Sequence, residues 1–211
     1  MDQVYDDAIW KTLEQLKASG KIRYYGIALG PAIGWLYEGV NCIRERDVTS
    51  IQHIYNMLEQ HPGRAMQDVA TELGKDTMFL IRVAHSSGML EGKYTAETVF
   101  PPTDHRSHRP RSWLLNGIKK IEKLRFLENF ERTLGQAALL WLLADDRVAS
   151  TLPNIYNEEQ LVEFARAPDC PPLTQDDLAK IDNLYSENFG VEEEPPKFKG
   201  TMELPKETAA A

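Results

Sequence analysis

The richest local chemistry in this sequence lies in residues 84–90, which read AHSSGML. The hydroxyls of Ser86 and Ser87 can donate hydrogen bonds to a ligand, and Gly88 allows a ligand to approach the backbone closely because it has no Cβ atom. Taken alone, a Ser-Ser-Gly run is more often an ordinary turn. Its value as a binding loop therefore depends on the elements that position it.

The histidines of the sequence do not predict a catalytic or metal site. His53, His61 and His85 have no acidic partner close by in sequence, and isolated histidines of this kind are more often structural. Two further histidines occur with an aspartate in TDHRSH, but in a polar loop such residues are usually exposed to solvent. We expect no metal site.

Composition and charge narrow the class of protein. The 211 residues, 42% of them hydrophobic, suit one globular domain. The net charge is −8 and the basic residues are dispersed, which argues against nucleic-acid binding. Cys42 and Cys170 are far apart and form no CxxC motif, and neither a signal peptide nor a membrane-spanning window is evident. We therefore expect a cytoplasmic protein without disulfides.

Strands and helices are predicted to alternate along the chain. Apolar, β-branched runs predict strands at 22–29, 49–55, 78–84 and 147–152. Helical periodicity predicts helices at 6–19, from after Pro31 to about 46, and at 63–73, 113–130, 134–143 and 158–166, with a last helix opened by Thr174 and Asp177. Residues 92–111 form a long loop. We expect residues 1–190 to form one domain and residues 191–211 to be disordered.

Alternating strands and helices imply a parallel sheet with right-handed crossovers, either closed as a barrel or open. The first strand–helix turn, IALGPAIG, lacks the GxGxxG motif, and no P-loop occurs in the sequence. The motifs typical of an open nucleotide-binding sheet are therefore missing, which favours the barrel. A complete (β/α)8 barrel has eight strands and usually about 250 residues. The sequence therefore favours an α/β fold that is a partial (β/α)8 TIM barrel of about four parallel strands.

Four stretches give a specific family resemblance. KASGKIRYYGIAL, IQHIYNMLE, RVAHSSGMLEGKY and STLPNIYNEEQLVEF resemble, in order and spacing, the second half of the aldo-keto reductase barrel, and the likeness runs from about Asp6 to Phe189. The resemblance implies an oxidoreductase that transfers hydride between NADP(H) and the carbonyl group of an aldehyde or ketone. NAD as the cofactor is left open.

The resemblance also implies where the cofactor binds. The amide of Gln52 matches the group that hydrogen-bonds the nicotinamide carboxamide, and Arg82 stands where an aromatic residue often faces the nicotinamide; an ion pair at the barrel rim is its equally good alternative. The AHSSGML loop resembles the one that receives the pyrophosphate, and STLPNIYNEEQ resembles the adenosine loop. The implied cofactor-binding residues are Gln52, Arg82, His85, Ser86, Ser87, Gly88, Asn157 and Gln160.

Several positions depart from the family pattern. Ala28 and Leu29 replace a usual Ser-Asn pair that helps to hold the nicotinamide amide. Tyr156 stands where a basic residue often meets the 2′-phosphate, Asn154 replaces a usual glycine, and Phe164 replaces a frequent asparagine. Adenosine contacts and the preference for NADP therefore stay open.

The family's catalytic aspartate, tyrosine, lysine and histidine come from the half of the barrel that this sequence does not match. No residue here can be nominated as the general acid, so no catalytic residue is predicted. A half barrel also leaves strand edges open to other chains. A separately encoded N-terminal half, a homodimer, or an upstream start would complete it, the last being simplest.

Two hypotheses follow. In the first, the chain is part of a reductase that is active only when completed. In the second, it is a non-catalytic remnant or an interaction module that binds a partner through its sheet edge.

Overall fold

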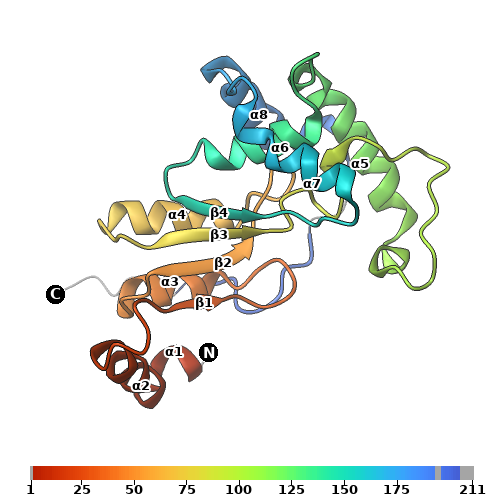
Figure 1. Cartoon of the computed structure of the whole chain (residues 1–211). Helices are drawn as coiled ribbons and strands as arrows, with labels where there is room; N and C mark the ends of the chain where they lie inside the picture. Colours follow the sequence, from red (N-terminus) through yellow and green to blue (C-terminus); the bar gives the residue numbers. More distant parts are fainter. Residues whose placement is uncertain (1, 193–195, 205–211) are drawn as a thin grey trace. The chain divides into compact units, whose positions relative to one another are not determined.

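The computed structural model describes residues 2–192 and 196–204 (Figure 1). Contacts between Cα atoms divide the chain into two units. The first unit combines residues 1–55 and 60–81 with the C-terminal segment from 196 onward, and the second combines 56–59 with 82–195.

Four strands alternate with helices along the chain, which confirms the predicted α/β class. The strands are β1 (Gly26–Ala28), β2 (Ser50–Ile54), β3 (Met78–Arg82) and β4 (Val148–Leu152), and the sheet order is β1-β2-β3-β4. In the first unit, β1 pairs in parallel with β2, with Gly26 opposite Ser50 and Ala28 opposite Gln52. Parallel neighbouring strands need a crossover connection, and the helices between these strands provide it.

β1 is shorter than the predicted strand at 22–29. Only three of its residues pair with β2, and Tyr24 is 68% exposed. A Cβ atom at Gly26 would lie 2.3 Å from the Ser50 hydroxyl oxygen, so the two strands approach closely where they do pair. The prediction from β-branched and aromatic composition therefore made this strand too long.

The first unit contains four helices: α1 (Asp2–Tyr5), α2 (Asp7–Ala18), α3 (Leu36–Glu45) and α4 (Gly63–Glu72). α2 begins where Asp6 accepts a hydrogen bond from the Ala8 amide, which is a side-chain N-cap. α3 and α4 approach closely, because a Cβ atom at Gly39 would lie 2.1 Å from the Met66 sulfur. The core of this unit includes Ile43, Met66 and Phe79, all fully buried.

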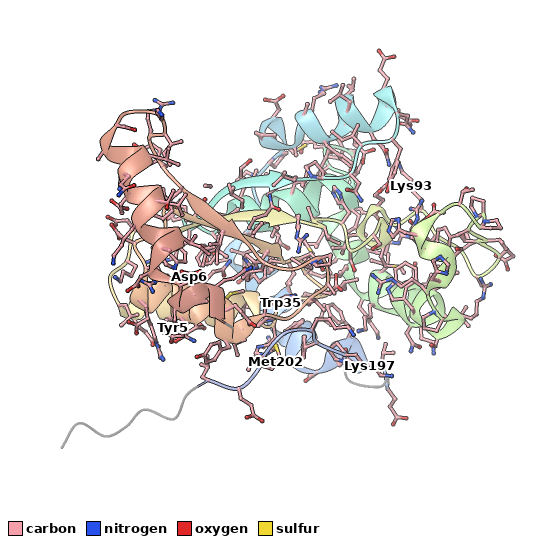
Figure 2. All side chains as sticks on the ribbon, turned by 90° about the horizontal axis from the view of Figure 1, so that it is seen from below. Tyr5, Asp6, Trp35, Lys93, Lys197 and Met202 are labelled. Atoms are coloured by element: carbon pink, nitrogen blue, oxygen red, sulfur yellow. The ribbon has the colours of Figure 1, made fainter. Side chains whose placement is uncertain are left out.

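The C-terminal segment of the first unit makes backbone hydrogen bonds to residues 33–37 in the part that the structure describes. Trp35 N–H donates to the Lys199 carbonyl at 2.8 Å, Lys199 N–H donates to the Ile33 carbonyl at 2.9 Å, and Tyr37 N–H donates to the Thr201 carbonyl at 2.9 Å. Figure 2 labels Trp35, Lys197 and Met202 in this part of the unit. Residues 193–195 and 205–211 lie outside the described residues.

The second unit is mainly helical apart from β4. Its helices are α5 (Arg111–Leu124), α6 (Leu134–Leu143), α7 (Glu158–Ala165) and α8 (Gln175–Ser186), with short 3-10 turns at Met89–Glu91, His105–His108, Arg125–Leu127, Ala167–Asp169 and Asn188–Gly190. α6 is buried nearly all round, as its apolar sequence predicted. The predicted capping box of Thr174 and Asp177 opens α8. Among the described residues, the helices are too short or too polar to span a bilayer.

Candidate functional site

The loop that follows β3 has an unusual backbone. Ser86 and Ser87 have φ angles of 47° and 58°, and Gly88 follows with 88°. Left-handed backbone is uncommon for residues with a Cβ atom, and such strained positions cluster at ligand sites. The turn is closed by Ser86 N–H, which donates to the Val83 carbonyl at 2.9 Å, and by Leu90 N–H, which donates to the His85 carbonyl at 3.1 Å.

Two residues that the sequence analysis did not select hold this loop in place. Asn56 Nδ2 donates to Glu59 Oε2 at 2.8 Å and to the Val83 carbonyl at 3.0 Å. Ser86 Oγ donates to the same Glu59 oxygen at 2.9 Å. The Ser86 hydroxyl therefore anchors the loop. Residues 56–59, which read NMLE, gave no sign in the sequence that they hold this loop, because the contacts join residues 27 positions apart.

Ser87 and Gly88 present the groups that best fit a ligand. Both residues are buried, yet among the described residues no acceptor receives the N–H of either one. Buried backbone N–H groups are nearly always paired, and adjacent N–H groups on left-handed backbone suit an anion. The Tyr94 hydroxyl donates to the Ser87 carbonyl oxygen at 2.8 Å, and this bond holds the peptide group between Ser87 and Gly88 in place.

Glycine is required at position 88. A Cβ atom there would lie 2.3 Å from the Tyr94 hydroxyl oxygen, and the φ of 88° is in the left-handed region. Gly88 therefore satisfies both the backbone conformation and the close approach of Tyr94.

His85 lies in the interior of the second unit. Its Nε2 lies 3.0 Å from the Gly135 carbonyl oxygen, and its ring stacks on Phe164 with the centroids 4.4 Å apart. Desolvation by burial lowers the pKa of His85, although the hydrogen bond to Gly135 opposes the shift. A neutral ring that donates from Nε2 fits these surroundings, so its observed contacts are structural.

Asn157 and Gln160 define the start of α7. The Asn157 side-chain oxygen accepts from the Gln160 amide at 2.8 Å, which is an N-cap. The Gln160 side chain accepts from Tyr156 N–H at 2.8 Å and donates to Glu91 Oε2 at 2.8 Å. Gln160 is buried, whereas Asn157 is exposed.

The remaining two predicted residues lie on strands. Arg82 ends β3 and is half-buried, and desolvation lowers the pKa of its guanidinium. Gln52 lies in β2, half-buried, and its carbonyl accepts from Leu29 N–H at 3.0 Å. The second unit thus contains seven of the predicted cofactor-binding residues, and Gln52 belongs to the first unit.

Comparison with known proteins identifies the family. The model of the aldo/keto reductase family matches residues 2–186. The chain belongs to this family. It is 29% identical over 177 residues to the L-glyceraldehyde 3-phosphate reductase of Escherichia coli K12, an alignment that covers 78% of the chain and 49% of the relative. The family resemblance inferred from the sequence is confirmed, and the family is one of oxidoreductases.

Solved structures agree at the level of the fold. The holo form of the aldo-keto reductase AKR11C1 from Bacillus halodurans matches with a TM-score of 0.62 and 24% identity, covering 84% of this chain and 55% of that one. The glycerol dehydrogenase AKR11B4 from Gluconobacter oxydans matches with a TM-score of 0.67 and 21% identity, covering 89% and 56%. The chain thus spans about half the length of the relatives it matches.

Proposed function

We propose that this aldo/keto reductase chain binds the dinucleotide cofactor of an NADP(H)-dependent reductase of aldehydes or ketones. The observation that carries the proposal is that Ser87 and Gly88, two buried residues in the loop after β3, donate their backbone N–H groups to no acceptor among the described residues. Loops after the late strands of (β/α)8 barrels are common phosphate sites. The names of relatives that act on glyceraldehyde 3-phosphate and on glycerol agree with a small carbonyl or alcohol substrate.

The chain's own residues fit the parts of such a cofactor. The Ser87 hydroxyl and the amides of Ser87 and Gly88 would receive the pyrophosphate, and the Gln52 amide would hold the nicotinamide carboxamide. Arg82 would lie against the nicotinamide, His85 and Ser86 would support the loop, and Asn157 and Gln160 would shape the adenosine end. When bound, the nicotinamide supplies the hydride.

Catalysis needs a proton donor as well as a cofactor. No residue of this sequence matches the family's aspartate, tyrosine, lysine or histidine motifs, so we assign the chain a binding and positioning role. Turnover by the chain would then require those groups from elsewhere. A non-catalytic module is the alternative function, and cofactor binding separates it from the first.

Cofactor titration followed by tryptophan fluorescence tests the proposal. We expect NADP⁺ to bind saturably, and Ser87→Ala to raise the dissociation constant about tenfold, because a hydrogen bond to a charged group contributes about 1.5–3 kcal/mol. Ser186→Ala is the matched control, since that exposed serine lies in α8 and donates only to the Asn183 carbonyl.

Molar mass and circular dichroism measured on the same samples separate the outcomes. A folded chain that binds neither NADP⁺ nor NAD⁺ would contradict the proposed function and favour the non-catalytic module. If binding occurs and Ser87→Ala leaves it unchanged, the pyrophosphate loop is misplaced.

A further inference from the structure

The long loop between β3 and α5 encloses a small, positively charged cavity within the second unit. The cavity has a volume of about 180 Å³, and its lining includes Phe100, Arg106, Ser107, Arg109, Arg111 and Trp113. The whole chain is acidic, with a net charge of −8, but residues 98–114 contain three arginines and one aspartate. Residues 98–114 therefore carry a net positive charge, although the chain as a whole is acidic.

One of the three arginines builds the wall of the cavity. Arg106 donates from Nε to Asp104 Oδ1 at 2.9 Å and from Nη1 to the Tyr94 hydroxyl oxygen at 2.5 Å. Its guanidinium carbon also lies 4.8 Å from the centre of the Phe100 ring. The ion pair with Asp104 neutralises this arginine and fixes the loop, so Arg106 adds rigidity rather than net charge.

The other two arginines keep their charge available. Arg109 lies over the Trp113 ring, 5.2 Å from its centre, and Arg111 Nη1 donates to the Thr98 carbonyl at 2.8 Å. Among the described residues, neither has a carboxylate within ion-pair distance. Both arginines are exposed, and each guanidinium group makes one of these contacts, so two guanidinium groups border one cavity with part of their freedom already restricted before a ligand binds.

We propose that this cavity is a binding site for a phosphoryl group. Two guanidinium groups without a carboxylate partner match the charge of a phosphate dianion better than the charge of a single carboxylate. A planar guanidinium group can also donate two parallel hydrogen bonds to phosphate oxygens. The volume admits a phosphate with a few further atoms but not a whole dinucleotide, because pockets for drug-sized ligands have about 300–1,000 Å³. The occupant is therefore a small phosphate ester or one phosphate of a larger molecule.

Titration of the full chain with inorganic phosphate at low ionic strength tests the site without any cofactor. Trp113 lines the cavity, so its fluorescence reports occupation, and calorimetry gives an independent affinity. We expect saturable binding that Arg109→Gln and Arg111→Gln each weaken about fivefold or more. Arg166→Gln, which removes one exposed charge from the same unit, should leave the affinity within about twofold.

Two results would overturn the site. Phosphate binding that does not saturate would do so, and so would equal weakening by all three substitutions, since that would report general charge and not a cavity. Because this arm uses phosphate alone, its outcome does not depend on the proposed cofactor function.

A second arm distinguishes the source of the phosphate once saturable binding is established. If the occupant is the 2′-phosphate of the cofactor, which rests on the proposed function, Arg109→Gln weakens NADP⁺ but not NAD⁺, and phosphate competes with NADP⁺ alone. If it is a small phosphate ester, glycerol 3-phosphate binds more tightly than phosphate, and NADP⁺ affinity is unchanged in Arg109→Gln. Failure of both patterns would contradict a phosphate ester as the occupant of the cavity.

Discussion

A buried histidine gives the second unit a pH-dependent stability. Nε2 of His85 faces the Gly135 carbonyl oxygen, and Nδ1 is buried without a hydrogen-bond partner among the described residues. Burial lowers the pKa of His85 below its ordinary value of about 6.5, so the unfolded chain takes up the proton more readily than the folded chain. The stability is complete above about pH 6.5 and falls as the pH is lowered toward the folded pKa.

Thermal unfolding across pH 5 to 8 checks this expectation. Replacing the ring by His85→Gln should flatten the acid side of the Tm profile, because the amide does not titrate, while lowering the Tm at neutral pH through lost packing on Phe164. The exposed His108→Gln serves as the control substitution and should leave the slope of the profile unaltered. An equal slope in wild type and His85→Gln would disprove the role of His85.

Gly88 is expected to be far less tolerant of substitution than another left-handed glycine. Gly88→Ala combines a strained φ with a Cβ atom 2.3 Å from the Tyr94 hydroxyl oxygen, whereas Gly190 has a φ of 67° and open space around it. Backbone strain alone costs about 1–2 kcal/mol. Urea unfolding should therefore show a loss of about 1–2 kcal/mol for Gly190→Ala and about 1–3 kcal/mol more for Gly88→Ala. Equal losses would mean that Tyr94 moves aside freely.

At the scale of elements, the N-terminus of α6 couples two helices. Thr133 Oγ1 accepts from Gln136 N–H at 3.1 Å and donates to Glu163 Oε1 of α7 at 2.7 Å. Thr133→Ala removes both bonds at the start of the most buried helix of the second unit. We expect a loss of about 1–2 kcal/mol in the free energy of unfolding, measured by urea denaturation.

The second capping box of the chain is a matched comparison. Thr174→Ala at the start of α8 removes the same bond to an amide at position N3. Among the described residues, the exposed Thr174 side chain bonds only within residues 174–177. We expect Thr174→Ala to lower the free energy of unfolding by only about 0.5–1 kcal/mol. If Thr174→Ala costs more than Thr133→Ala, the contact with Glu163 contributes nothing.

Elements with a clear period were predictable from the sequence. α6 has the predicted bounds, and α2, α4, α7, β2, β3 and β4 lie within two residues of theirs, because apolar spacing reports burial directly. β1 was overestimated because its length depends on how far β2 runs beside it. The backbone bonds of the C-terminal segment to residues 33 and 35 could not be predicted, because its polar composition gives no sign of them.

The candidate site was predictable only in part, and for a similar reason. Ser86, Ser87 and Gly88 were selected by residue type, but their left-handed backbone was not visible in the sequence. The anchoring role of Asn56 and Glu59 depends on contacts across 27 residues, which no local pattern encodes. The hydrogen bonds of the Gln160 side chain to Tyr156 and Glu91 were likewise not visible in the sequence.

At the scale of the whole molecule, the C-terminal segment is part of the first unit. Besides its backbone bonds, Phe198 packs edge-on against His61, with the ring centres 5.4 Å apart. Deleting residues 196–211 should remove the acceptors of the Trp35 and Tyr37 amides. We expect these two amides to lose protection from hydrogen exchange by about tenfold or more, since each lost backbone bond exposes a donor to solvent.

The amide of Leu29 is an internal reference in the same experiment. It donates to the Gln52 carbonyl within β1 and β2, and should keep its protection if the deletion acts locally. Loss of protection at Leu29 as well would show that the segment supports the unit as a whole. Unchanged exchange at Trp35 and Tyr37 would contradict the pairing.

The pairing of Gly34 with Lys199 also has a consequence for the order of folding during synthesis. The first unit is assembled from the beginning and the end of the chain, with nearly all of the second unit translated between them. Since a ribosome releases residues in order, the second unit can finish folding while the first still lacks its last segment. We therefore infer that the first unit is completed only after the segments of the second unit have been released.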